Sequence, residues 1–155
     1  MISTRPTNGG IDHGRLGSLR CSDGSPYQDA VEAWVRAAAL VWAYREPDHY
    51  LILSVDDDYS DDLVAACAFQ RDDDRDKHWF INALAVARHR QGVGHGRRLL
   101  TTCLDRMAQS TPGGSARWRV APGGRAAHQL SRTIGAEVVD VPQERPFAVY
   151  FVRFA

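Results

Sequence analysis

The sequence predicts an α/β protein of the α+β kind, with a mixed central sheet and helices on both faces. Three observations indicate this fold class. Apolar runs rich in β-forming residues occupy the middle of the chain, strand and helix patterns alternate after them, and a glycine-rich segment joins a strand to a helix. At 155 residues, the chain is long enough to bury one domain core without metals or disulfides. We expect a leader over residues 1–24 and a single folded domain over 25–155.

The leader is rich in Gly, Ser, Thr and Asp and has no apolar periodicity. This composition predicts a mobile or extended segment with at most a short strand at 18–21. A helix then begins at Ser25-Pro26, because serine caps helix starts and proline fits their first turn. Its apolar residues follow a broadly helical spacing, and it ends before Pro47.

The middle of the chain predicts a β-hairpin followed by a further strand. Two apolar runs, 49–55 and 63–69, flank the acidic segment 56–62. A second acidic turn leads to the strand 78–86, which ends just before the glycine-rich segment. The remaining expected elements are a helix that stops at 112–114, a strand at 116–121, a helix over about 125–134, and strands near 136–141 and 148–154.

The glycine-rich segment 91–96, Gln-Gly-Val-Gly-His-Gly, is the most informative feature of the chain. Glycines let the backbone turn tightly, and the unpaired N–H groups and dipole of the following helix favour an anion such as a phosphate. A dinucleotide fingerprint needs a third glycine, where this chain has Arg97 or Leu99, and an NTPase phosphate loop needs a lysine, whereas the only lysine is Lys77. Basic side chains surround the segment, at Arg88, His89, Arg90, His95, Arg97 and Arg98.

The segment resembles the acyl-CoA loop of the GNAT superfamily of N-acetyltransferases, whose pattern is Gln/Arg-x-x-Gly-x-Gly/Ala about five residues after a strand-end valine. Here the valine is Val86, and the loop runs from Gln91 to Gly96. The order of elements from residue 49 to the C-terminus is also similar to the GNAT fold. The resemblance implies acetyl-CoA as the cofactor, and it implies cofactor-binding roles for Leu84, Ala85, Val86, Gln91, Gly92, Val93, Gly94, His95, Gly96 and Arg97.

The resemblance also implies where the rest of the cofactor lies. In the family, the strand before the loop separates from the strand after the next helix, and backbone groups of the strand pair with the pantetheine arm. In this chain those regions are 83–86 and 118–120. The arginines around the loop are candidates for the cofactor's phosphates, since guanidinium groups match phosphate oxygens.

Acetyl transfer to an amine needs a route for a proton, because an ordinary amine has a pKa of ~10. Many relatives carry an acid on the strand where this chain has Asn82, whose amide takes no proton and can only orient water or substrate. His78 shares that strand face by alternation and titrates in the right range, which makes it a candidate base. The alternative for His78 is an exposed histidine of an edge strand, and Asp76 is a further candidate base.

A general acid would protonate the leaving thiolate. GNAT relatives often place a tyrosine four residues before a Gly-Phe pair, and by resemblance Ser131 occupies that position before Gly135-Ala136. A serine hydroxyl is far less acidic, so three other routes stay open: water, another residue such as Tyr150, and unaided departure of a thiolate whose thiol has a pKa of ~8.5. Ser131 is otherwise expected on the plain surface of its helix.

Composition excludes several classes of protein. The formal net charge is zero, which argues against a dedicated nucleic-acid binder. The three cysteines have no metal-ligand spacing, so we expect no metal site and a reducing cytoplasm. No apolar run approaches the ~18 residues of a membrane span, and we expect no membrane partner.

The sequence therefore predicts a cytoplasmic, acetyl-CoA-dependent N-acetyltransferase in which the amine of a small molecule or peptide attacks the thioester directly. One alternative is a non-catalytic acyl-CoA-binding or sensing module. Another is an aminoacyl-tRNA-acetylating toxin of the same fold, which the neutral charge disfavours. The sequence leaves both a monomer and a homodimer open.

Overall fold

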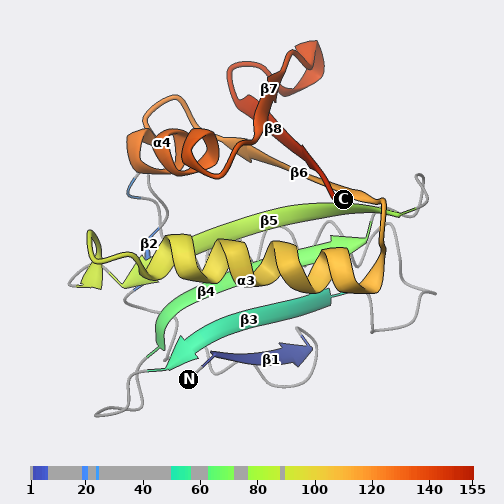
Figure 1. Cartoon of the computed structure of the whole chain (residues 1–155). Helices are drawn as coiled ribbons and strands as arrows, with labels where there is room; N and C mark the ends of the chain where they lie inside the picture. Colours follow the sequence, from blue (N-terminus) through green and yellow to red (C-terminus); the bar gives the residue numbers. More distant parts are fainter. Residues whose placement is uncertain are drawn as a thin grey trace.

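The chain forms a mixed sheet with helices packed on it (Figure 1). The structure is a computed structural model, and it describes residues 2–6, 19–20, 24, 50–56, 63–71, 77–87 and 90–155. In chain order, its elements are β1 (Ile2–Pro6), β2 (Leu19–Arg20), β3 (Tyr50–Asp56), β4 (Leu63–Arg71), β5 (His78–Ala87), α3 (His95–Ser110), β6 (Ser115–Val120), α4 (Arg125–Thr133), β7 (Glu137–Val139), the 3-10 helix η3 (Pro142–Glu144) and β8 (Ala148–Arg153).

The strands have the order β1-β3-β4-β5-β6-β8-β7, and β2 pairs with the end of β5. Neighbouring strands are antiparallel except β5 and β6, which are parallel because α3 connects them as a crossover helix. The predicted mixed sheet and the predicted hairpin, formed by β3 and β4, are confirmed. The helix expected from Ser25 to before Pro47 lies outside the described residues.

The sequence prediction misses β1. Residues Ile2–Pro6 pair with β3 at the edge of the sheet, whereas at most a short strand at 18–21 was expected in this part of the chain. The segment has one strongly apolar residue, so a hydrophobic pattern could not reveal a strand that is held by backbone pairing. β2 does fall within the expected range, and it pairs with Val86 and Ala87.

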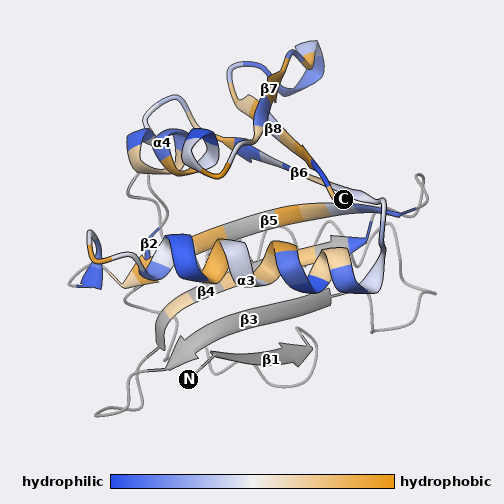
Figure 2. Ribbon diagram, viewed as in Figure 1, coloured by the Kyte–Doolittle hydropathy of each residue, from blue (hydrophilic) through white to orange (hydrophobic). Residues whose placement is uncertain are grey.

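One apolar cluster joins the sheet to both described helices. In Figure 1, α3 crosses β4 and β5, and α4 lies beside the end of β6. Hydrophobic and hydrophilic residues alternate along α3, as an amphipathic helix requires (Figure 2). The cluster includes Leu99, Leu100, Cys103 and Met107 of α3 and Phe69, Trp79, Trp118 and Tyr150 of the sheet, with Leu130 of α4 packed against it. Because both described helices pack on the same cluster, they lie on one face of the sheet. Helices were predicted on both faces, and the remaining predicted helix lies outside the described residues.

The turn from α3 into β6 requires a glycine. A Cβ atom at Gly114 would lie 2.3 Å from the backbone oxygen of Lys77, far inside van der Waals contact. The helix closes just before it, where the Thr111 N–H donates to the Met107 oxygen at 2.8 Å. The Thr111 hydroxyl also accepts a hydrogen bond from Trp79 Nε1 at 2.8 Å, which ties the helix end to β5. Neither described helix is long and apolar enough to cross a bilayer.

Candidate functional site

β5 and β6 separate halfway along β5. Their parallel pairing ends where Ile81 lies opposite Trp118, although β5 continues to Ala87 and β6 to Val120. The backbone of the second half of β5 is therefore not paired with β6. This is the separation that the sequence resemblance implies for 83–86 and 118–120.

A β-bulge accounts for the separation. The pairing of β5 with β4 jumps from Ile81 to Ala83, which leaves Asn82 without an opposite residue. A bulge bends its strand and increases its twist, and bulges are frequent beside active sites. The bulge at Asn82 lies one residue beyond the last pair with β6, so it bends β5 at the point where the two strands part.

A cleft of about 690 Å³ occupies the gap between the strands. This size is typical of small-molecule sites. The walls come from the diverging half of β5, the end of β6, the glycine-rich segment with the first turn of α3, and α4. Wall residues include Leu84 and Val86 of β5, Trp118 and Val120 of β6, and Ala127 and Leu130 of α4.

The glycine-rich segment closes one end of the cleft. Gly92 and Gly94 have φ angles of 84° and 92°, a left-handed backbone conformation that residues other than glycine rarely adopt. The Gln91 side chain donates from Nε2 to the Val86 oxygen at 3.2 Å and so holds the segment against the end of β5. Gly94 is the N-cap of α3 and supplies no side-chain hydrogen bond, so the first N–H groups of the helix lack a side-chain cap.

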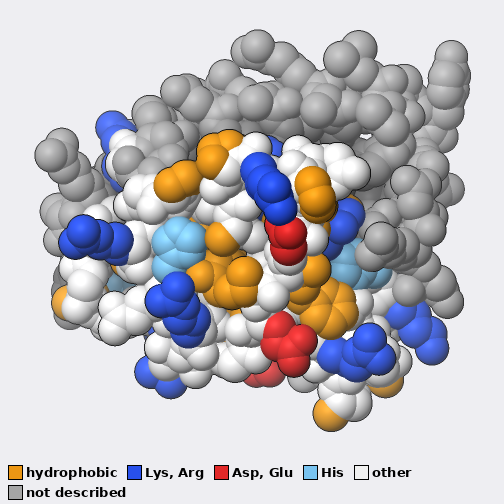
Figure 3. Space-filling view, turned by 90° about the horizontal axis from the view of Figure 1, so that it is seen from above, with side chains coloured by type: hydrophobic (Ala, Val, Ile, Leu, Met, Phe, Trp, Pro, Cys, Tyr) orange, Lys and Arg blue, Asp and Glu red, His pale blue; other side chains and the backbone are white. Residues whose placement is uncertain are grey.

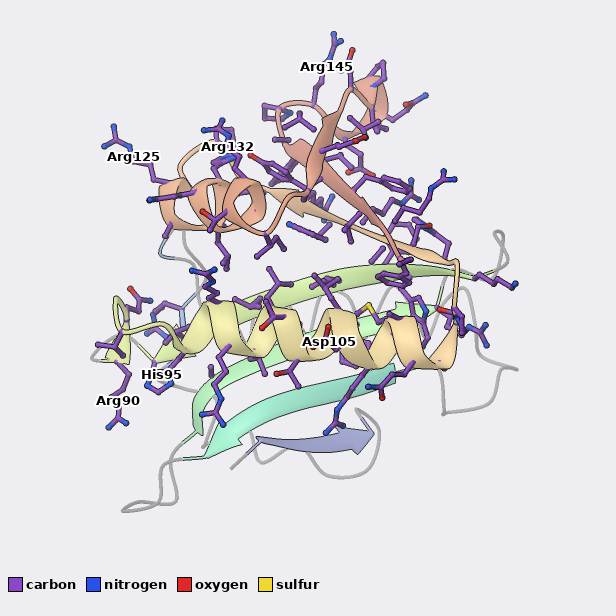
Figure 4. The ribbon with its side chains drawn as sticks, in the orientation of Figure 1. Arg90, His95, Asp105, Arg125, Arg132 and Arg145 are labelled. Atoms are coloured by element: carbon purple, nitrogen blue, oxygen red, sulfur yellow. The ribbon has the colours of Figure 1, made fainter. Side chains whose placement is uncertain are left out.

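The cleft is electropositive. Among the described residues that line it there is no Asp or Glu, and the first turn of α3 has no acidic residue. Figure 4 shows Arg90 and His95 at the start of α3. Figure 3 shows, on the face seen from above, hydrophobic side chains in the middle with acidic ones beside them and basic ones around them. The uncapped N–H groups, the helix dipole and these basic side chains favour a phosphate-bearing ligand. The basic residues that line this end of the cleft are Arg20, Arg90, His95 and Arg97, whereas Arg119 of β6 lines another part of it.

The structure brings nine of the ten expected cofactor-binding residues to this cleft. The exception is Val93, whose side chain is 71% exposed and which does not line the cleft. The nine are Leu84, Ala85, Val86, Gln91, Gly92, Gly94, His95, Gly96 and Arg97.

Ser131 lies on the α4 wall, and it is buried rather than on plain helix surface. Its hydroxyl accepts a hydrogen bond from Trp118 Nε1 at 2.9 Å and donates one to the Ala127 oxygen at 2.7 Å. A hydroxyl has one proton to donate, so the proton of Ser131 is already engaged within its own helix.

His78 lies away from the cleft, at the end of β5 that remains paired with β6. It is buried, its Nδ1 contacts the Ser115 hydroxyl, and its ring packs between Phe80 and Phe151. The expected alternative, an exposed edge-strand histidine, is wrong because strands flank β5 on both sides. The side chain of Asn82 and all of Asp76 lie outside the described residues.

Tyr150, the further candidate acid, is held in a buried chain of hydrogen bonds. Its hydroxyl is 2.7 Å from His128 Nδ1, and His128 Nε2 is 3.0 Å from the Ala121 oxygen. Because a carbonyl only accepts, Nε2 donates to the Ala121 oxygen. Tyr150 also stacks on Trp118 and does not line the cleft, so it supports the wall from behind.

Sequence reasoning placed 118–120 at the gap but gave the Arg119 side chain no role, and it missed Phe147 and the apolar part of the α4 wall, all of which line the cleft. For α4, the spacing of four residues between Ala126 and Leu130 marks one helix face and could have indicated it. No comparable signal marks Arg119 or Phe147. Within the described part of the chain, no group of His, Cys, Asp and Glu side chains could hold a metal ion.

Comparison with known families gives one match. The model of the acetyltransferase (GNAT) family matches residues 18–136, which is most of the chain. No curated protein matches the chain.

Solved structures share its fold. The IAA acetyltransferase from Bacillus cereus has a TM-score of 0.71 at 13% identity, with 99% of each chain covered. The ribosomal-protein-S18-alanine N-acetyltransferase from Escherichia coli has a TM-score of 0.69 at 15% identity, covering 100% of this chain and 94% of its own. A chain of the NatC complex bound to Gag peptide and CoA has a TM-score of 0.67 at 17% identity, with 99% of both chains covered.

Proposed function

We propose that this chain, which belongs to the acetyltransferase (GNAT) family, transfers an acetyl group from acetyl-CoA to the amine of a small molecule or peptide. One observation carries the proposal. The gap between β5 and β6 is an electropositive cleft that ends at the uncapped start of α3. The names of two neighbours of the same fold, an alanine N-acetyltransferase and a complex with peptide and CoA, support an amine acceptor.

The residues of the cleft fit acyl-CoA. The first N–H groups of α3 and the segment from Gln91 to Arg97 would hold the pyrophosphate. The backbone of β5 over residues 82–85, which pairs with neither β6 nor β2 on this edge, would pair with the pantetheine arm. When bound, acetyl-CoA supplies a thioester that an amine can attack.

In this proposal the backbone carries most of the chemistry. N–H groups of β5 next to the bulge at Asn82 would donate to the oxygen that becomes negative during transfer, because this edge is released from β6. Asn82 would orient water or substrate. We assign proton removal to water rather than to His78, since His78 does not line the cleft. The thiolate would leave without a side-chain acid, since the Ser131 proton is engaged.

A non-catalytic acyl-CoA-binding module is the second candidate function. It is favoured by the absence of an Asp or Glu among the described lining residues and by the engagement of the Ser131 hydroxyl. Such a module would hold acyl-CoA in the same cleft and release no thiol.

Thiol release separates the two candidates. The purified protein is incubated with acetyl-CoA and a panel of amino acids, peptides and small amines, free thiol is followed over time, and acetylated amines are identified by mass spectrometry. We expect thiol release that depends on the amine. Binding of acetyl-CoA without amine-dependent release would support the binding module, and absence of binding would contradict both candidates.

A further inference from the structure

The cleft is lined from both faces of the sheet. Successive side chains of a strand point to opposite faces. Trp118 and Val120 are buried on the helix-covered face, where Trp118 donates to Ser131 of α4. Arg119 lies between them in sequence, so it belongs to the opposite face, and it still lines the cleft. The gap between β5 and β6 therefore passes through the sheet.

This arrangement gives the two substrates separate routes. The uncapped start of α3 and α4 lie on the helix-covered face, where the proposed function places the cofactor. Among the described residues, the face that carries Arg119 is then the side from which an acceptor amine reaches the gap. Side chains at that mouth are the ones that select the acceptor.

Arg119 is held at this mouth by two neighbours. Its Nη1 donates to Glu144 Oε2 of η3 at 3.1 Å, and its guanidinium carbon lies 4.9 Å from the centre of the Phe147 ring. The Arg119 side chain is nevertheless 61% exposed, and Phe147 is 37% exposed and also lines the cleft. Among the described residues, no further hydrogen bond engages the guanidinium, which has five N–H donors.

The chemistry of this cluster favours a carboxylate. A guanidinium presents two parallel N–H groups that match the two oxygens of a carboxylate. Glu144 already offsets the positive charge of Arg119, so recognition here depends on the geometry of the hydrogen bonds more than on charge, which suits a single negative charge better than a doubly charged phosphate. The Phe147 ring beside it offers an apolar surface to the rest of the ligand.

We propose that Arg119 is a specificity-determining residue that binds a carboxylate of the acceptor, so that the acceptor is an amine bearing a carboxylate, such as an amino acid or a short peptide. Glu144 and Phe147 are positioning residues that hold the guanidinium at the mouth. This inference rests on the proposed function, because it assigns the acceptor of the same cleft.

The test compares amino acids and dipeptides with their carboxamides as acceptors, in steady-state kinetics at saturating acetyl-CoA. Loss of a charge-assisted pair costs about tenfold to hundredfold. We expect the wild type to prefer carboxylates by at least about tenfold in kcat/KM. Arg119→Met should remove this preference by raising the KM for the carboxylate, with the KM for acetyl-CoA within about twofold. Arg119→Lys should lose almost as much, because it keeps the charge but not the paired N–H groups.

Arg145→Met is the matched control. Arg145 belongs to the connection between β7 and β8, as Glu144 and Phe147 do, and it pairs with Asp140 at 2.7 Å. It does not line the cleft, and it points away from the rest of the molecule (Figure 4). It should leave acceptor preference unchanged. Equal use of carboxylates and carboxamides by the wild type, or a raised KM for acetyl-CoA in Arg119→Met, would overturn the proposal.

A binding measurement tests carboxylate recognition by Arg119 even if the protein transfers no acetyl group. Calorimetry with CoA present measures the affinity of N-acetyl amino acids and of their carboxamides. Preference for the carboxylate in the wild type and its loss in Arg119→Met would support the proposal even if no transfer occurs, in which case only the proposed function fails. Equal affinities for the two ligands would overturn it.

Discussion

Gly96 lies where the first turn of α3 meets the end of β5. A Cβ atom there would be 3.5 Å from Val86 Cγ2 and 3.7 Å from Leu84 Cδ2, which is ordinary van der Waals contact. The residue therefore offers a clean substitution site, whereas Gly94, with its φ of 92°, would be strained by any side chain.

Gly96→Glu should abolish acetyl-CoA binding, with a loss of at least about hundredfold in affinity. The new carboxylate would sit at the N–H groups that the pyrophosphate needs, and a negative charge near a helix start does not destabilise the helix. Gly96→Ala is the control and should bind within about fivefold of the wild type, since only van der Waals contacts are added. The shift of Tm with added CoA measures both, and a normal shift in Gly96→Glu would exclude the start of α3 as the anion site.

Ser131→Ala should cost stability more than turnover. The substitution leaves the buried Trp118 N–H without its acceptor, which costs about 1–3 kcal/mol. Turnover should change by less than about tenfold, because the thiolate can leave near its own pKa. Denaturant unfolding and kcat are measured on the same preparation. A hundredfold loss of kcat at unchanged stability would restore Ser131 as the acid.

At the scale of elements, the turn between α3 and β6 connects two elements that form walls of the cleft. Gly114→Ala should destabilise the protein by more than about 2 kcal/mol, because the added Cβ would meet the Lys77 oxygen, a backbone atom that cannot rotate away. Gly123→Ala, in the turn between β6 and α4, should change stability by less than about 0.5 kcal/mol, since nothing lies within 4 Å of its added Cβ. Unfolding in urea compares the two, and equal midpoints would show that the turn adapts.

Local sequence patterns predicted most elements because most of them bury one face. The amphipathic spacing of α3 and the apolar runs of β3 and β4 are visible in the chain, and the glycine-rich segment marks the start of α3. β1 was missed because its pairing is a backbone property of polar residues. The bulge at Asn82 has no local signal either, since it is defined by the register of two partner strands, and separation of β5 from β6 was expected only by family resemblance.

The residues of the site that lie close together in the sequence were predictable, and those that only folding brings together were not. Nine of the ten residues expected to bind the cofactor reach the cleft, because they come from two short segments, 84–86 and 91–97, which end β5 and begin α3. The position of His78, away from the cleft, was not predictable because strand alternation gives the face of a residue but not its place along the gap. Arg119 and Phe147 come together only when β6 and the connection to β8 are folded, which no short motif records.

At the scale of the whole molecule, the buried thiol of Cys67 links stability to pH. A hydrogen bond to Cys103, followed by burial, raises the pKa of the Cys67 thiol. The folded protein then keeps a proton that the unfolded chain loses above a pH of ~8.5, so stability should fall as pH rises through that value, by up to ~1.4 kcal/mol per pH unit. In urea unfolding between about pH 8 and 10, Cys67→Ala should show a shallower fall of stability with pH than the wild type. Parallel curves would contradict this assignment.

The net charge of the molecule does not describe the charge around the cleft. The formal charge is zero, yet the described lining of the cleft carries arginine and histidine and no acid. A net charge of zero therefore disfavours a broad basic surface that binds a polyanion such as a nucleic acid. It is compatible with a site that binds one phosphate-bearing ligand at a single helix start.

Isothermal titration of the wild-type protein with acetyl-CoA shows whether the cleft between β5 and β6 is an acyl-CoA site. We predict saturable binding of one acetyl-CoA per chain, weakened by added salt because cations and helix N–H groups hold the phosphates. If the folded protein gives no heat of binding up to millimolar acetyl-CoA, the cleft is not an acyl-CoA site.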